Sequence, residues 1–370
     1  MASAYMHGMQ DAGLIASAKH FPGDGYDYYD QHLTTTVNNL SMDEWHKKSG
    51  KCFKALIDEG VSAIMPGHIS LPAYDTPDEK LGLCPPASLS YPLMTDLLKG
   101  ELGFEGIIVS DAIGMNGAVG FMEYYEACAA FWENGGDVLL FVEMDHLHEE
   151  LDKLIKNGKL KIQTLINRAY RVLCFKDQIG LFDQTSSVEA FDTKEQEALL
   201  EKTVKESITL VRDRENLIPR SIDKDTRILH VIIMNDSESH KSYTDELTNE
   251  LKKLSDNVTE KTDPGPDVLF FDARDNKYDL IICSIGGALS YGLNVARLHG
   301  PIARNMMNGW TKLSTPVIFV SPLQPYIHKE YEPSIDTIIN TYGITQCTAK
   351  EVAKKIIGKE SINKNLYAHS

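Results

Sequence analysis

The sequence lacks any long uninterrupted hydrophobic run. No segment of its 370 residues approaches the ~20 consecutive apolar residues that a membrane-spanning helix needs. The first six residues contain neither a basic region nor a long apolar core, so they are unlike a signal peptide. We therefore expect a protein with no membrane association and place it in the cytoplasm.

Basic residues are scarce relative to acidic ones. The chain has 37 Lys and Arg against 53 Asp and Glu, which gives a formal net charge of -16. A field of that sign repels phosphate backbones, so we expect no nucleic-acid partner. With 42% hydrophobic and 24% charged residues, the composition is that of a globular protein with room for two or three domains.

Cysteines are few and scattered. The six of them form no CxxC pair and do not cluster with histidine, so a disulfide framework and a metal site are both disfavoured. Glycine-rich cofactor motifs are also missing. Gly23-Asp24-Gly25 lacks the Gly and Lys of a phosphate loop, and Gly286-Gly287 lacks the dinucleotide fingerprint. We expect no metal and no cofactor.

The first half of the chain alternates short apolar runs with helical stretches. The opening residues have the pattern of an amphipathic helix that leads directly into the first strand. We predict strands at 15–19, 61–65, 106–110 and 137–141, and helices at 42–59, 91–102, 122–134, 145–157 and 161–176. This alternation is typical of βαβ units around a parallel sheet. A closed (β/α)₈ barrel has eight such units, so four units make half a barrel.

A second α/β region follows a connector. We predict an N-terminal domain at 1–182, a connector at 183–226 with a long helix at 192–211, a second domain at 227–358 and a tail at 359–370. The second domain should be an open sheet with helices on both faces. Its expected strands are 228–233, 268–271, 280–283, 317–320 and 337–340, and its expected helices are 242–255, 295–312 and 348–357.

Charged side chains gather where predicted strands end. Lys19 and His20 close the first strand, and a charged pair in an otherwise apolar strand favours a functional role. Asp111 follows the third strand. A buried carboxylate there is either a nucleophile or electrostatic stabiliser, or the N-cap of the following helix. In parallel barrels, catalytic groups lie at these strand ends.

Two histidines lie in the loops after the first two strands. Asp30 and His32 are two residues apart, so the carboxylate can orient the imidazole and leave its other nitrogen for proton transfer. The alternative is a pair of solvated loop residues. His68 follows Pro66-Gly67 and is either a structural turn residue or a ligand contact.

In combination, these segments resemble glycoside hydrolase family 3, and within it the β-N-acetylhexosaminidase type. The resemblance covers nearly the whole chain. It rests on Lys19-His20-Phe21-Pro22-Gly23 with Asp30-x-His32, Met65-Pro66-Gly67-His68, Pro86-Ala87-Ser88-Leu89-Ser90, Glu101 to Asp111 with Met115, and Glu206-Ser207-Ile208-Thr209-Leu210-Val211 with Leu217-Ile218-Pro219. Asp24 departs from the second histidine that many members carry in this loop.

The resemblance implies a retaining hydrolase of terminal β-linked N-acetylglucosamine. Asp111 matches the nucleophile, His32 the acid/base and Asp30 its partner. Lys19 and His20 match residues that hold the sugar, and we add His68 and Met115 as substrate contacts. The fold implied is the C-terminal half of a (β/α)₈ barrel, about strands 5–8, followed by an α/β sandwich domain.

The missing four strands would carry an Asp and an Arg that hold the sugar from the other side. We therefore expect the chain to need either a complementing N-terminal half-barrel chain or a second copy of itself.

Three alternatives remain open. Relatives with this dyad that use phosphate in place of water make a phosphorylase the nearest one. The chain is otherwise a non-catalytic remnant that acts as a binding or assembly module. A plain β-glucosidase is the third alternative, although such members usually take their acid/base Glu from elsewhere.

Overall fold

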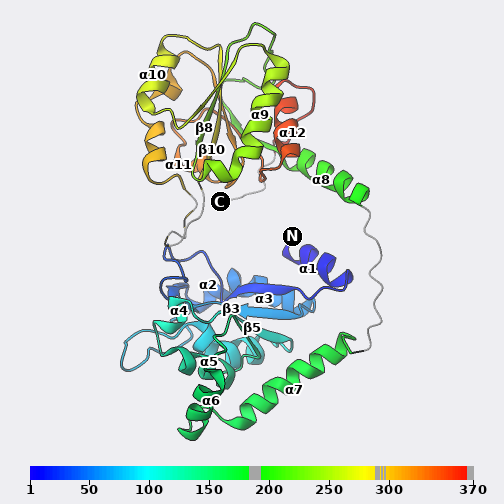
Figure 1. Cartoon of the computed structure of the whole chain (residues 1–370), viewed down its shortest axis with the longest axis vertical. Helices are drawn as coiled ribbons and strands as arrows, with labels where there is room; N and C mark the ends of the chain where they lie inside the picture. The colour runs from blue at the N-terminus through cyan, green and yellow to red at the C-terminus, as the bar shows by residue number, and fades with distance from the viewer. Residues whose placement is uncertain (183–192, 288–291, 293–294, 296, 365–370) are drawn as a thin grey trace. The chain divides into compact units, whose positions relative to one another are not determined.

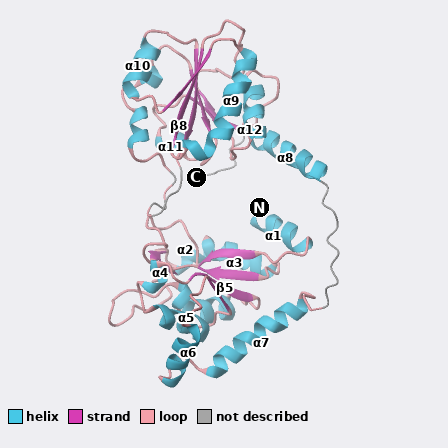
Figure 2. Ribbon diagram, viewed as in Figure 1, coloured by secondary structure: helices cyan, strands magenta, loops and turns pink. Residues whose placement is uncertain are grey.

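The computed structural model describes residues 1–182, 193–287, 292, 295 and 297–364 (Figure 1). The chain divides into two compact units. The first unit comprises residues 1–187 and 290–294, and the second comprises 188–289 and 295–370. Each unit is built around its own sheet, shown in magenta in Figure 2. Within the described residues, we find no helix that is both long enough and apolar enough to cross a membrane.

The first unit contains a four-stranded parallel sheet in the order β1-β3-β5-β6. All four strands expected in this region are confirmed, with ends shifted by a few residues. They are β1 (Ser17–Phe21), β3 (Ala63–Pro66), β5 (Ile107–Ala112) and β6 (Val138–Leu140). Because the strands are parallel, their carboxyl ends meet at one edge of the sheet. A short parallel pair, β2 (Thr36–Val37) with β4 (Ile69–Ser70), was not expected.

Helices follow the strands of the first unit as predicted, with one break. The expected helix at 42–59 is two helices that meet at Lys48, whose ψ of -96° departs from helical geometry. A capping box between Ser41 and Glu44 starts the first of them. The helices are α1 (Ala2–Asp11), α2 (Met42–Lys47), α3 (Ser49–Asp58), the π-helix η2 (Pro92–Glu101), α4 (Asn116–Val119), α5 (Tyr124–Glu133), α6 (Leu147–Lys156) and α7 (Ile162–Gln178). The 3₁₀ turn η1 (Ala87–Leu89) precedes η2.

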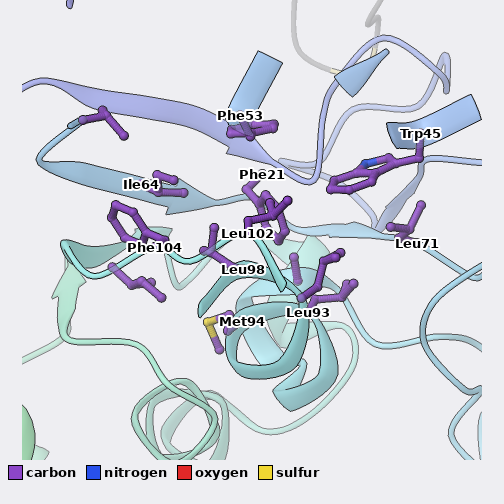
Figure 3. Close-up of a cluster of buried hydrophobic side chains, with 14 of the residues drawn as sticks. Phe21, Trp45, Phe53, Ile64, Leu71, Leu93, Met94, Leu98, Leu102 and Phe104 are labelled. Atoms are coloured by element: carbon purple, nitrogen blue, oxygen red, sulfur yellow. The ribbon is translucent and has the colours of Figure 1, made fainter. Parts of the chain in front are cut away.

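An apolar core fixes the loop that follows β1. Phe21, the last residue of β1, packs edge-on against Trp45 and Phe53, with ring centroids 6.1 and 5.3 Å apart (Figure 3). Trp45 is fully buried, and its Nε1 donates a 2.7 Å hydrogen bond to the carbonyl of Pro22. The core therefore anchors the chain at the point where it leaves the sheet.

The second unit is an open six-stranded sheet in the order β7-β12-β11-β10-β8-β9. All neighbours are parallel except β7, which runs antiparallel to β12. The expected open α/β sheet is confirmed. Its strands are β7 (Thr209–Asp213), β8 (Ile228–Met234), β9 (Val258–Thr262), β10 (Leu280–Gly286), β11 (Val317–Ser321) and β12 (Thr337–Asn340). Its helices are α8 (Thr193–Ser207), α9 (Lys241–Leu254), α10 (Pro266–Arg274), α11 (Ile327–Glu330) and α12 (Gln346–Ile356).

Three sequence predictions in this unit are wrong. The strand expected at 268–271 is part of α10, because Gly265 at a φ of +87° and Pro266 at the first turn begin a helix. The strand that this part of the chain does contain is β9. It was not predicted, because it is half exposed and its mostly polar sequence has no apolar run. The helix expected at 295–312 is replaced, in its described part, by the 3₁₀ turns η4 (Pro301–Met306) and η5 (Trp310–Lys312), which follow Gly300 and Gly309.

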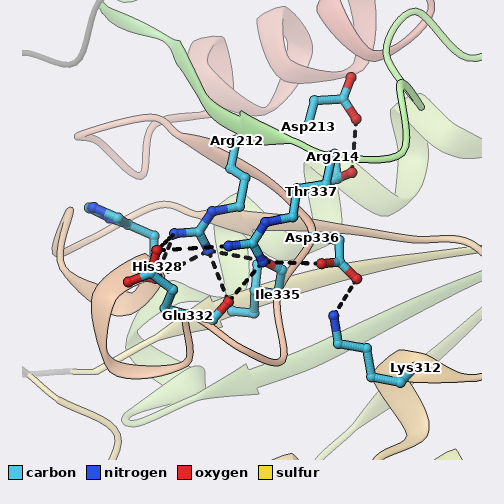
Figure 4. A network of polar contacts seen from close by, with 9 residues as sticks. All are labelled: Arg212, Asp213, Arg214, Lys312, His328, Glu332, Ile335, Asp336 and Thr337. Carbon is cyan, nitrogen blue, oxygen red and sulfur yellow. Dashed lines mark hydrogen bonds and ion pairs between the residues drawn. The ribbon is translucent and has the colours of Figure 1, made fainter.

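The long helix expected at 192–211 is also wrong at its end, since α8 stops at Ser207 and β7 begins at Thr209. The predicted connector thus supplies an edge strand to the second sheet. Arg212 of β7 donates to the carbonyls of His328 and Ile335, and Arg214 pairs with Asp336 (Figure 4). Pairing with β12 and these long-range partners fix the segment as a strand, which its β-branched residues also favour.

His230, in the middle of β8, predicts a pH-dependent stability for the second unit. Its ring is fully buried between the hydroxyls of Thr248 and Ser284, at 2.7 and 2.9 Å. Burial lowers the pKa of His230 to about 4. The folded state therefore binds its proton more weakly than the unfolded state does. The stability that the neutral ring supports is complete above pH 6.5 and is lost as pH falls from 6.5 toward 4.

We expect urea unfolding of the second unit, followed by circular dichroism, to show about 2 to 3 kcal/mol less stability at pH 4.5 than at pH 7 from this residue. His230→Gln should flatten that dependence. His148→Gln, on the exposed face of α6, should leave it unchanged. An equally steep pH dependence in His230→Gln would show that other groups are responsible.

Candidate functional site

His20 links the ends of two strands in the first unit. Its Nδ1 lies 2.9 Å from Asp24 Oδ2, and its Nε2 lies 3.3 Å from Asp111 Oδ2. The side chain is about one-fifth exposed, so the ring stands at the rim of the sheet. Lys19, the preceding residue, is exposed, and no described acidic side chain lies within ion-pair distance of it. The structure thus brings His20 to Asp111 and leaves Lys19 at the surface.

Asp111 lies within β5, one residue before its end. Its Oδ1 accepts a 2.8 Å hydrogen bond from the backbone N–H of Ala112, and its Oδ2 faces His20. The next helix, α4, has Met115 as its N-cap, so Asp111 does not cap it. One alternative reading of Asp111 is thereby excluded. The carboxylate is held at both oxygens and is still one-fifth exposed, so a small molecule in solvent can reach it.

Asp30 and His32 form the pair that their spacing predicted. His32 Nδ1 lies 2.6 Å from Asp30 Oδ1, and the same oxygen accepts the backbone N–H of His32 at 2.9 Å. His32 is about half exposed, whereas Asp30 is mostly buried. Burial of Asp30 raises its pKa, but N–H donors from His32 and Gly292 outweigh this effect and hold the pKa below its usual range. The carboxylate is therefore ionised and can orient the imidazole.

The loop that carries this pair is held against the segment that follows Asp111. The backbone N–H of Asn116 donates to the carbonyl of His32 at 3.1 Å, and that of Gly117 donates to the carbonyl of Gln31 at 3.2 Å. A Cβ on Gly117 would lie only 2.5 Å from the Gln31 oxygen, so this close approach requires glycine. These contacts keep the dyad loop at the same end of the sheet as Asp111.

His68 is completely buried and bonded on both ring nitrogens. Nε2 lies 3.1 Å from the carbonyl of Ala112, and Nδ1 lies 2.8 Å from the hydroxyl of Ser88. Burial lowers the pKa of His68, although the carbonyl of Ala112 and the carboxylate of Asp111 partly oppose this effect. The carbonyl needs a donor, so Nε2 carries the proton. These contacts favour the structural role, in which His68 steadies the end of β5. A direct substrate contact stays a prediction.

The sequence prediction missed two residues of this site. Asp24 was given no role in the site, yet it accepts hydrogen bonds from both the ring and the backbone N–H of His20. Gln31, between the dyad residues, joins Asp24 to the backbone of His68. The only sign of the His20–Asp24 contact in the sequence was the short spacing of these two residues. It was overlooked because the glycines on either side of Asp24 are explained by a turn. Met115 is half-buried and caps α4, so its predicted substrate contact also stays a prediction.

The described part of the chain contains no group of three or more His, Cys, Asp or Glu side chains arranged to hold a metal ion. A fixed carboxylate and a carboxylate–imidazole pair at one end of a parallel sheet are the groups needed for nucleophilic and acid–base work on a polar substrate.

The first unit thus combines a parallel α/β sheet with a site of carboxylates and histidines at the carboxyl ends of its strands. Residues 1–175 match the family model described as the glycosyl hydrolase family 3 N-terminal domain.

The chain is also similar to curated proteins with glycosidase names. A "Beta-N-acetylglucosaminidase/beta-glucosidase" of Cellulomonas fimi is 28% identical over 97% of this chain and 66% of its own length. A "Beta-hexosaminidase" of Methylobacillus flagellatus is 32% identical over 44% of each chain.

Solved structures are similar over nearly the whole chain. A "Beta-glucoside phosphorylase BglX" bound to 2FGlc superposes with a TM-score of 0.87 and 28% identity, over 99% of this chain and 67% of that one. A Paenibacillus family 3 β-N-acetylglucosaminidase gives a TM-score of 0.78 at 22% identity, over 98% of this chain and 69% of that one, and shows likeness of fold alone. The chain thus spans about two thirds or less of the curated relatives it matches.

Proposed function

We propose that this protein is a retaining exo-glycosidase that releases terminal β-linked N-acetylglucosamine or a related N-acetylhexosamine. One observation carries the proposal: Asp111 lies near the carboxyl end of β5, and the loop of the Asp30–His32 pair is hydrogen-bonded to the segment that follows Asp111. The substrate class rests on the names of the relatives, which are β-hexosaminidases and a β-N-acetylglucosaminidase/β-glucosidase.

The proposed reaction has two displacements at the anomeric carbon. Asp111 attacks that carbon while the imidazolium of His32 gives its proton to the departing glycosidic oxygen, which leaves a covalent glycosyl–Asp111 ester. Water then attacks the same carbon and yields its proton to His32, and the carboxylate of Asp111 leaves. Asp30 stabilises the imidazolium in the first step and fixes the orientation of the ring in both. His20 keeps the Asp111 oxygen in place.

A phosphorylase is the second candidate, favoured by the similarity to the β-glucoside phosphorylase. In that reaction a phosphate oxygen attacks the glycosyl–Asp111 ester, the carboxylate leaves, and the product is a sugar 1-phosphate. An acid/base of the imidazole type does not repel an anionic acceptor as a carboxylate would.

The test is turnover of 4-nitrophenyl N-acetyl-β-glucosaminide and of the matching β-glucoside, with and without inorganic phosphate, with products identified by ³¹P NMR. Free N-acetylglucosamine supports the hydrolase, and a 1-phosphate supports the phosphorylase. A clear preference for the glucoside would contradict the proposed substrate class.

We further propose that the first unit is half of a (β/α)₈ barrel. Four of the eight strands such a barrel needs are present, and each end strand, β1 or β6, has one neighbour among the described strands. Apolar side chains stand exposed beside both edges, including Leu14 and Ile15 before β1 and Phe141 after β6. On α7 the exposed stripe of Ile162, Ile166, Tyr170 and Leu173 follows one helical face.

The partner we propose for these edges is a complementing N-terminal half-barrel of four β/α units. Unpaired strands with apolar flanks associate readily. A cavity of about 580 Å³ runs along β1 and another of about 470 Å³ along β6, so each edge has a groove beside it. About a third of the Cellulomonas relative lies outside its match to this chain, and that segment is the natural probe.

Complementation tests this partner. The chain is mixed with the unmatched segment of the Cellulomonas relative, and mass and turnover are measured by native mass spectrometry and the assay above. A one-to-one complex with restored turnover supports the proposal. A complex of two copies of this chain would overturn it in favour of a homodimer. A well-folded one-to-one complex without turnover would favour the non-catalytic binding or assembly module. The matched surface variants are Tyr170→Glu on α7 and Phe271→Glu on α10, of which only the first should weaken the complex.

A further inference from the structure

The carboxylate of Asp30 is held by a third donor that the mechanism above does not use. Its Oδ1 accepts the backbone and ring N–H groups of His32, while its Oδ2 accepts a 2.8 Å hydrogen bond from the backbone N–H of Gly292. Gly292 is 262 residues further along the chain and belongs to the first unit, within the segment 290–294. A distant peptide group thus completes the environment of a mostly buried carboxylate.

The second contact changes what Asp30 can do. A carboxylate bound through one oxygen is free to rotate about its Cβ–Cγ bond, and rotation would take the bonded oxygen out of line with His32. Donors on both oxygens fix the plane of the group. The Gly292 donor also helps to offset the raising effect of burial on the Asp30 pKa, so the group stays charged.

The backbone conformation at position 292 favours glycine. Its φ is +83°, a conformation that residues with a side chain rarely adopt. A Cβ there would also lie 3.2 Å from Cδ1 of Leu33, the residue that follows His32. A side chain at position 292 would therefore strain the segment and press on the dyad loop.

We propose that the peptide N–H of Gly292 is a positioning group for the Asp30–His32 pair, holding the carboxylate in the orientation that proton transfer by His32 requires. The inference rests on the proposed role of this pair as acid/base. It predicts that substitutions at Gly292 alter proton transfer by His32 and leave sugar binding intact.

The test compares Gly292→Pro, which removes the donor, with Gly292→Ala, which keeps the N–H but strains the segment. Gly300→Ala is the matched control, because Gly300 also has a positive φ and has open space around it. The first readout is the titration of the Asp30 carboxyl carbon by ¹³C NMR, which needs no activity. We expect the Asp30 pKa to rise in Gly292→Pro and in Gly292→Ala, and to stay as in the wild type in Gly300→Ala.

The second readout is turnover of glycosides with poor and with activated leaving groups. Gly292→Pro should lose about tenfold on the poor leaving group, the size of one lost hydrogen bond to a charged group, with KM unchanged. The activated substrate should be affected less. An unchanged Asp30 titration in folded Gly292→Pro would overturn the inference. If that titration moves but His32→Ala is fully active, the positioning contact stands and the proposed acid/base role fails.

Discussion

Asp111→Asn should reduce turnover of an N-acetyl-β-glucosaminide by at least about a thousandfold, the scale of losing a group that bonds to the reacting carbon. The amide has the size of the carboxylate and can still accept the N–H of Ala112 at Oδ1, so the local fold should be kept. It cannot form the ester intermediate. The measurement is kcat in the complemented enzyme, with circular dichroism to confirm folding.

A second variant shows whether Asp111 is the nucleophile or only a carboxylate that orients the substrate. In Asp111→Gly, added azide should restore turnover of an activated glycoside by attacking the exposed anomeric carbon, and the product should be a glycosyl azide of inverted configuration. Asp43→Asn, on the exposed first turn of α2, is the charge-matched control and should turn over normally. Wild-type turnover in Asp111→Asn would remove the central step of the proposed mechanism.

His32→Ala should produce the second large effect, and its size should depend on the leaving group. We expect a loss of about 10² to 10⁴-fold on an alkyl or sugar leaving group, the usual contribution of a positioned acid–base group. A 2,4-dinitrophenyl glycoside needs no protonation to leave, so its first step should be nearly unaffected. The measurement is kcat/KM across a series of leaving groups of increasing acidity.

Asp30→Asn should fall between wild type and His32→Ala on the same series, because the ring remains but loses the charge that stabilises its protonated form. His148→Ala, an exposed histidine on α6, is the control. A loss in His32→Ala that is equal for good and poor leaving groups would point to a role in folding or binding, and would leave the acid unidentified.

The sequence located the chemistry through local features. The spacing of Asp30 and His32 predicted a contact that the structure contains, because two residues so close in a loop need only one turn to meet. The four parallel strands of the first unit were also predictable, because each overlaps a short apolar run of the kind that strands of parallel sheets have. Two strands of the second unit were missed. The mostly polar β9 has no such run, and β7 lay at the end of an expected helix, while distant partners of Arg212 hold it in the sheet.

The sequence alone thus determined the order of elements and the pair of residues joined by a short loop. Only the tertiary structure decided which distant groups complete the site: His20 beside Asp111, His68 under the end of β5, and Gly292 on the far oxygen of Asp30. The physical reason is that hydrogen bonds across 262 residues, or between neighbouring parallel strands, depend on sheet order and register. The spacing of residues within one loop specifies neither the order of strands in a sheet nor the partner of a distant peptide group.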